Sequence, residues 1–193
     1  MPSGTTHDRI TLWTLPCITG ITYGLTNLDG DLTLLLSGGY LFSGLMFGPD
    51  LDIRSVQFKR WGVLRGIWRP YRKLLRHRSF FSHGLIIGTC LRVIYLSLFL
   101  SAIAIFFVGI AQLLLGFDWN WRDFAIAQYN LLTDRYYNET IALFIGLELG
   151  AMSHSISDFI GSYRKKRLKK RQLKAKTKQV KRSSRLITTK KKS

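Results

Sequence analysis

Residues Val93–Phe117 read VIYLSLFLSAIAIFFVGIAQLLLGF and contain no charged side chain. A helix needs about 20 mostly apolar residues to cross the hydrocarbon core of a bilayer. This run of twenty-five residues is long enough to cross with some tilt. It therefore predicts a transmembrane helix and places the chain among helical membrane proteins.

Three weaker apolar runs raise the expected number of spans to about four. Ile10–Leu28 and Leu32–Pro49 are uncharged, and the second of them contains Gly38, Gly39 and Gly44, small residues that permit close helix packing in lipid. Thr140–Gly161 is interrupted by ionisable side chains and is a span only if these face other protein. For the first two runs, a buried helical hairpin in a soluble core remains the alternative. The expected fold class is all-α, a polytopic helical membrane bundle.

The charge of the chain predicts its orientation. Lys and Arg outnumber Asp and Glu by 29 to 11, and sixteen of the basic residues lie between Arg164 and Lys192. Another nine lie between Arg54 and Arg78, whereas the connection 118–139 is mainly acidic. Because short cytoplasmic loops are enriched in Lys and Arg, we expect the basic loop and both termini on the cytoplasmic side of a bacterial inner membrane, either cytoplasmic or thylakoid.

The basic C-terminal segment is expected to form a separate region. We divide the chain into a membrane domain over residues 1–162 and a disordered polybasic cytoplasmic tail over residues 163–193. Next to a membrane helix, such a tail favours anionic lipid headgroups as its partner. Nucleic acid is disfavoured, because Arg164–Ser193 contains no aromatic residue to stack on bases.

The loop between the second and third apolar runs has an amphipathic pattern. Aromatic and leucine side chains recur there at spacings of three or four, with Arg residues interleaved: Phe58, Trp61, Leu64, Trp68, Tyr71 and Leu75. This pattern predicts a helix lying in the membrane interface, bent near Pro70. A helix packed with the same face on a protein core is the alternative.

All four histidines lie in short polar clusters at the ends of apolar runs. The clusters hold His7 with Asp8, Asp50 with Asp52, His77 with His83, and His154 with Asp158. Under the expected topology, all four lie at the cytoplasmic face, and the topology was derived without using them. Imidazole and carboxylate together suit zinc, iron, manganese or nickel. Each cluster alone has a plainer explanation as a helix cap or stop, but together they predict a metal site.

The same residues carry a resemblance. The segments MPSGTTHDRIT, GPDLD and RGIWRPYRKLLRHRSFFSHG resemble a family of small bacterial membrane proteins described as uncharacterised metal-binding proteins and well represented in cyanobacteria. HRSFFSH is also similar to the HR-x-x-x-x-H pattern of membrane-bound metal-dependent hydrolases. The resemblance covers about residues 1–160 and implies a metal site without a known substrate. The implied ligands are His7, Asp8, Asp50, Asp52, His77, His83, His154 and Asp158.

These residues leave three functions open, two with a metal ion and one without. A metal-dependent hydrolase would hold one or two divalent transition metal ions, zinc first among them, with an open position for water. Asp8 or Asp52 would be its general base, and Arg78 would hold the anionic group of an amphiphilic or phosphate-bearing substrate. A non-catalytic metal-binding or metal-handling protein is the alternative. A metal-free lipid phosphatase, suggested by HSISD, is disfavoured because the K-x6-RP motif of that group is missing.

Two further charges are expected inside the bundle. Arg92 and Glu148 lie nine residues after His83 and six before His154. An unpaired charge at that depth is costly, so we predict that the two side chains face each other as a pair. The alternative is that either of them borders a water-filled cleft.

Overall fold

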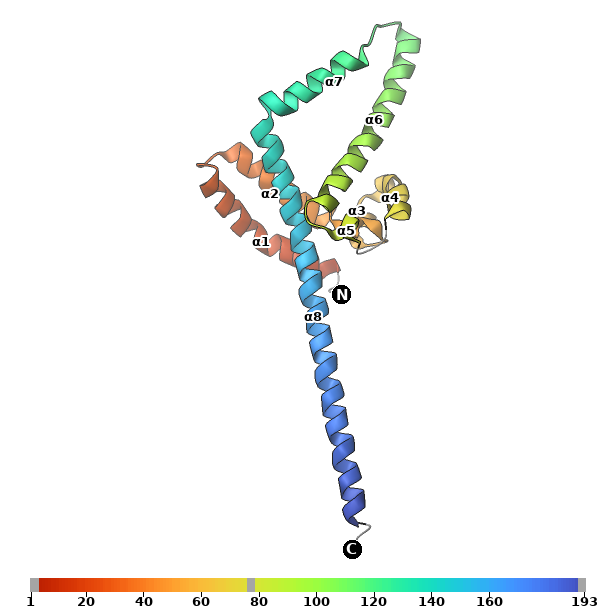
Figure 1. Cartoon of the computed structure of the whole chain (residues 1–193). Coiled ribbons are helices and arrows are strands. Elements are labelled where there is room, and N and C mark those ends of the chain that lie inside the picture. Colours follow the sequence, from red (N-terminus) through yellow and green to blue (C-terminus); the bar gives the residue numbers. More distant parts are fainter. Residues whose placement is uncertain (1–3, 76–78, 191–193) are drawn as a thin grey trace. The chain divides into compact units, whose positions relative to one another are not determined.

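The computed structural model describes residues 4–75 and 79–190 (Figure 1). Over these residues the chain forms helices and no strand, which confirms the all-α prediction. It divides into two compact units, Ser3–Ser155 and the residues from Ile156 onward. The elements are α1 (Gly4–Leu25), α2 (Gly30–Leu45), η1 (Pro49–Asp52), α3 (Val56–Arg60), η2 (Gly62–Ile67), α4 (Trp68–Leu74), α5 (Phe80–His83), α6 (Ile87–Leu115), α7 (Trp121–Asn130), η3 (Leu131–Arg135) and α8 (Tyr137–Lys190).

Three helical segments among the described residues are long and apolar enough to cross a membrane. They are Gly30–Asp52, Ile87–Leu115 and Tyr137–Lys174. The first apolar run, most of which lies in α1, does not meet this criterion, so three of the four expected spans are supported and the fourth stays a prediction. α6 ends where Gly116 adopts a left-handed conformation with φ +65°, close to the expected end of the longest run.

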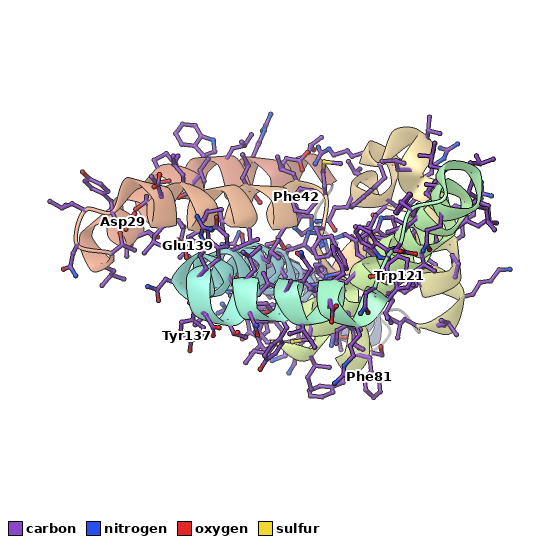
Figure 2. The ribbon with its side chains drawn as sticks, turned by 90° about the horizontal axis from the view of Figure 1, so that it is seen from above. Asp29, Phe42, Phe81, Trp121, Tyr137 and Glu139 are labelled. Carbon is purple, nitrogen blue, oxygen red and sulfur yellow. The ribbon has the colours of Figure 1, made fainter. Side chains whose placement is uncertain are left out.

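α1 and α2 form an antiparallel hairpin, with Asp29 at its turn (Figure 2). The turn is fixed by the Asp29 side chain, which accepts a hydrogen bond from Leu32 N at 3.0 Å. Hydroxyl side chains join the two helices along their length: Thr19 to Ser37 at 3.0 Å and Thr26 to Thr33 at 3.2 Å. Hydroxyls therefore face inward between the helices.

The outward surface of the same hairpin is apolar. Trp13 is 81% exposed, and Leu25 and Leu34 are also largely exposed. This arrangement, with hydroxyls between helices and apolar side chains outside, is the polarity expected of helices in lipid. Thr11 and Thr22 of α1 are buried, so these polar side chains face protein.

Glycines bring α2 close to the first part of α8. A Cβ atom at Gly146 would collide with the carbonyl of Leu36, and one at Gly150 would collide with the carbonyl of Tyr40. A Cβ at Gly39 would lie 2.8 Å from the carbonyl oxygen of Leu143. The two helix backbones therefore touch, as small residues allow in membrane bundles, and the end of α2 lies beside residues 147–154.

An aromatic core lies next to this contact between α2 and α8. Its buried members are Phe47, Leu51, Phe58, Trp68, Tyr71 and Leu147. Trp68 is fully buried, and its ring packs against those of Trp61, Tyr71 and Tyr95 with centroids 5.1–5.6 Å apart. The core joins the loop segment α3–α4 to α6 and α8.

This core changes the interpretation of the amphipathic loop. The sequence predicts a single interfacial helix, whereas the structure has three short helices, α3, η2 and α4. Gly62, with φ +53°, interrupts the segment. Pro70 falls in the first turn of α4, where its missing N–H costs nothing. Because Phe58, Trp68 and Tyr71 point into the core, the structure favours the alternative of an aromatic face packed on protein.

The basic C-terminal segment belongs to α8. The sequence predicts a disordered tail from residue 163, whereas the structure has helix as far as Lys190. Lys, Arg, Gln and Leu are good helix formers, which accounts for a helix in spite of the repulsion between like charges. The division of the chain at residues 162 and 163 stays a prediction.

Candidate metal centre

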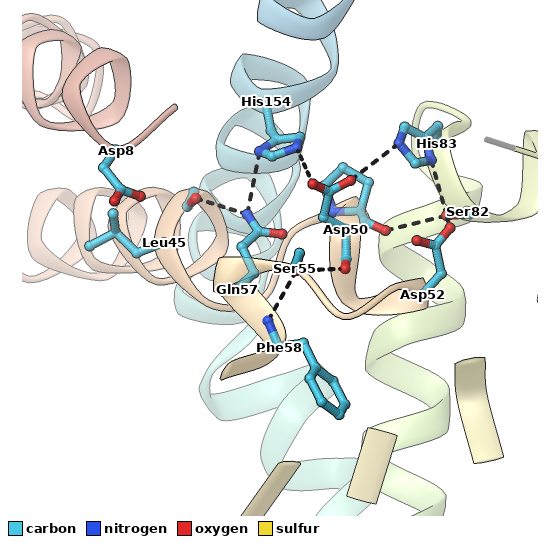
Figure 3. A network of polar contacts seen from close by, with 12 residues as sticks. Asp8, Leu45, Asp50, Asp52, Ser55, Gln57, Phe58, Ser82, His83 and His154 are labelled. Carbon is cyan, nitrogen blue, oxygen red and sulfur yellow. Dashed lines mark hydrogen bonds and ion pairs between the residues drawn. The ribbon is translucent and has the colours of Figure 1, made fainter. Parts of the chain in front are cut away.

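The PDLD turn after α2 directs two carboxylates to different partners. η1 begins at Pro49, and its Leu51 is fully buried in the aromatic core. This anchor fixes the backbone between Asp50 and Asp52. Asp50 faces the histidines of α5 and α8, and Asp52 faces Ser82 (Figure 3).

Asp50 is the central residue of the cluster. Its Oδ2 lies 3.2 Å from Nε2 of His154, and its Oδ1 lies 3.9 Å from Nε2 of His83. The three residues come from η1, α8 and α5, which are far apart in the sequence. One carboxylate thus bridges two imidazoles.

His7 completes the cluster from the start of α1. Its ring is stacked on that of His154, with centroids 3.9 Å apart and planes inclined by 19°. Both rings are buried, and each offers a nitrogen within 4.8 Å of the other. The antiparallel hairpin brings His7 to this cluster, because the start of α1 lies beside the end of α2.

Gln57 supports His154 and was missed by the sequence analysis. Its Nε2 donates to Gly44 O at 2.9 Å and lies 3.5 Å from Nδ1 of His154. A side chain at Gly48 would collide with this amide, so a larger residue there would displace Gln57 from its present position. The contact joins residues 97 positions apart, and no local sequence pattern predicts it.

Ser82 connects Asp52 to His83 and was also missed. Its hydroxyl donates to Oδ2 of Asp52 and contacts Nδ1 of His83 at 3.0 Å. Because a hydroxyl has one proton to donate, its oxygen accepts from Nδ1–H of His83. That tautomer directs the lone pair of Nε2 toward Asp50. A metal-binding histidine is commonly oriented in this way by its second nitrogen.

Asp8 lies at the edge of the cluster and is paired with Arg60. Both guanidinium nitrogens of Arg60 donate to the carboxylate, one of them at 2.8 Å. The hydrogen bond raises the pKa of Arg60, against the smaller opposing effect of its partial burial. A bidentate pair of this kind fixes the carboxylate in one orientation.

Three other expected site residues lie outside the described residues or outside the unit that holds this cluster. His77 and Arg78 lie outside the described residues. Asp158 falls in the second unit, four residues after His154 along α8. Their roles stay predictions.

The expected pair of buried charges is close but not in direct contact. Arg92 and Glu148 line the same cavity of about 10 Å³, beside Ser82 and His83. Arg92 donates to Ser82 O at 3.2 Å and to Thr89 Oγ1 at 2.8 Å, while Glu148 accepts from Ile86 N at 2.9 Å. The two residues thus hold the backbone on either side of His83, and the cavity has room for about one water molecule.

The donors of the cluster fit a metal ion. A hollow of about 20 Å³ is lined by His7, Asp8, Gly44, Asp50, Val56, Gln57 and His154. Two N or O ligands of one zinc ion, each at about 2.0–2.2 Å, are at most about 4.4 Å apart. The contacts of Asp50 with His154 and His83, 3.2 and 3.9 Å, lie within that limit. Imidazole and carboxylate without thiolate form the donor set of a transition metal.

The comparisons with known proteins agree with this geometry. No curated protein and no solved structure matches the chain. The model of one family, described as "Uncharacterized metal-binding protein (DUF2227)", matches residues 2–168. The match includes His7, Asp50, His83 and His154 and confirms the expected metal-binding family, while the similarity to membrane-bound hydrolases stays a prediction. The chain therefore belongs to this family of metal-binding proteins.

Proposed function

We propose that this protein is embedded in a membrane and holds a divalent transition metal ion, zinc first among them, between His7, Asp50, His83 and His154. The observation that carries the proposal is the Asp50 carboxylate, which contacts His83 and His154 while His7 stacks on His154. Burying these polar groups together is costly unless they are paired or bind a cation. Asp52 acts through Ser82, holding His83 in the orientation that presents Nε2.

Two features of the structure support membrane embedding. α6 presents large apolar side chains to its surroundings along its whole length, with Leu98, Phe106 and Leu113 more than 60% exposed. An exposed apolar surface of this size is stable in lipid and not in water. The α1–α2 hairpin has hydroxyls inside and apolar side chains outside.

The hairpin also bears on topology. α1 has 22 residues and is about 33 Å long at 1.5 Å per residue. If α2 crosses the membrane, α1 must cross it as well to bring His7 back to Asp50. This geometry and the basic loop support our proposal of four crossings, with both termini and the metal centre at the cytoplasmic face of a bacterial inner membrane.

Hydrolysis is the first function proposed for the site. A zinc ion with an open position supplies a nucleophilic water near neutral pH. Of the two carboxylates expected to act as general base, Asp8 lines the hollow with His7 and Asp50, whereas Asp52 does not. This position supports Asp8 as the proposed general base, with Arg60 fixing its orientation. An amphiphilic or phosphate-bearing substrate suits a site at the membrane surface.

A non-catalytic metal centre is the second candidate. The observation that favours it is the size of the hollow, about 20 Å³, which holds an ion or a water but no substrate. In that case the protein carries or buffers the ion.

One experiment separates the two candidates. Purified full-length protein is assayed for transition metals by mass spectrometry and for hydrolysis of p-nitrophenyl phosphate, alongside Asp8→Asn and His83→Ala. A hydrolase shows turnover that falls in Asp8→Asn while its metal is retained, and loses both properties in His83→Ala. Metal without turnover supports the non-catalytic centre. Folded wild-type protein that binds no transition metal contradicts both.

A further inference from the structure

A second pocket, separate from the metal centre, lies on the loop segment α3–α4. It has a volume of about 530 Å³, within the range of about 300–1,000 Å³ typical of small-molecule sites. We call it the basic pocket, because six of its seven lining residues are cations and none is acidic. The lining residues are Arg54, Phe58, Lys59, Arg65, Arg69, Arg72 and Lys73.

The aromatic core explains why these cations are gathered there. Phe58, Trp68 and Tyr71 occupy the core-facing positions of α3 and α4, so the basic residues between them are turned outward. Gly62, with φ +53°, interrupts the segment between the two helices. Arg65 in η2 and Arg69 in α4 thereby line the same hollow as residues of α3.

The wall of the pocket is ordered by an aromatic contact. The guanidinium of Arg72 lies over the ring of Phe58, 4.7 Å from its centroid. A cation–π contact of this kind positions the guanidinium while leaving its N–H donors available to a ligand.

The cations of the basic pocket have no acidic partner among the described residues. The neighbouring Arg60 shows the contrast, because it is paired with Asp8, whereas the six lining cations form no ion pair with any described carboxylate. Six like charges around one hollow repel each other and produce a strong positive potential, which an anion relieves.

We propose that the basic pocket binds a phosphate group, presented either by an anionic lipid headgroup or by a soluble phosphate-bearing molecule. Four of the six cations are arginines, whose planar guanidinium binds phosphate through two parallel hydrogen bonds. The proposal does not depend on a metal ion and goes beyond the function proposed for the metal centre.

The test compares two variants that remove the same charge from full-length protein. Arg65→Ala/Arg69→Ala removes two exposed cations of the pocket, and Lys169→Ala/Lys170→Ala removes two exposed cations of α8. Affinity is measured by native mass spectrometry for dioleoyl phosphatidic acid and by calorimetry for glycerol phosphate and inorganic phosphate. Thermal unfolding confirms that each variant is folded, and Arg72→Lys keeps the charge of the pocket while removing a guanidinium.

Arg65→Ala/Arg69→Ala is expected to bind its phosphate ligand at least about tenfold more weakly than wild type, since hydrogen bonds to charged groups are the stronger class. The affinity of Lys169→Ala/Lys170→Ala should stay within about twofold of wild type. Binding of phosphatidic acid alone identifies a lipid headgroup as the ligand, and binding of the soluble phosphates as well identifies a soluble one. Equal losses in both double variants, or no binding by the wild type, would overturn the proposal.

Discussion

Replacing Asp50 by Asn tests the metal centre at its most connected residue. Asparagine has the shape of aspartate, and the neighbouring Leu51 is fully buried in the aromatic core, so the turn should keep its conformation. The change removes the negative charge that lies 3.2 Å from His154 and 3.9 Å from His83. Any loss of metal binding can therefore be assigned to that charge.

The expected loss is large. Removing a group that only orients a metal ligand costs about 10–100-fold in affinity. In the proposed site Asp50 is a direct ligand, so we expect at least about 100-fold weaker zinc binding, or about 2.7 kcal/mol. Competition with a chromophoric chelator measures the affinity in detergent.

The matched control is Asp118→Asn, which removes an exposed carboxylate between α6 and α7 and should leave zinc affinity unchanged. Folded Asp50→Asn protein that binds zinc as tightly as wild type would refute the assignment of Asp50 as a ligand.

Three other predictions concern the same framework. His7→Ala and His154→Ala should weaken zinc binding non-additively in a double-mutant cycle, because the two rings are stacked; additive losses would mean independent sites. Gly146→Val should lower the free energy of unfolding by about 1–3 kcal/mol through collision with α2, while Gly109→Val, where a Cβ meets open space, should have a much smaller effect in thermal unfolding. Leu51→Ala should cost about 2–5 kcal/mol by opening a cavity in the aromatic core and should also weaken zinc binding; unchanged stability would show that Leu51 does not anchor the turn.

Sequence patterns predicted the features that depend on neighbouring residues. The uncharged run 93–117 became α6, and hydropathy alone was sufficient for that. The placing of histidines at the ends of apolar runs also suggested a shared site. In the structure His7 stacks on His154, and Asp50 contacts both His154 and His83, while the role of these residues as metal ligands stays a prediction.

The individual side-chain pairings that support the cluster could not be predicted in this way. Gln57 reaches His154 across 97 positions, and Arg60 reaches Asp8 across 52. Such pairings are decided by how helices pack, and they leave no periodicity in the chain. The amphipathic loop shows the same limit. Spacings of three and four identify an apolar face that includes Phe58 and Trp68, but they do not distinguish a face buried in lipid from one packed on a protein core.

Zinc K-edge X-ray absorption of the purified, zinc-loaded protein tests the central claim most directly. The account predicts a first shell of nitrogen and oxygen at about 2.0–2.2 Å, with the multiple scattering of two or more imidazoles and no sulfur. In Asp50→Asn, oxygen scattering should fall while the imidazole signal of any remaining bound zinc persists. A sulfur shell at about 2.3 Å, or zinc surrounded by water without imidazole, would contradict a His/Asp metal centre.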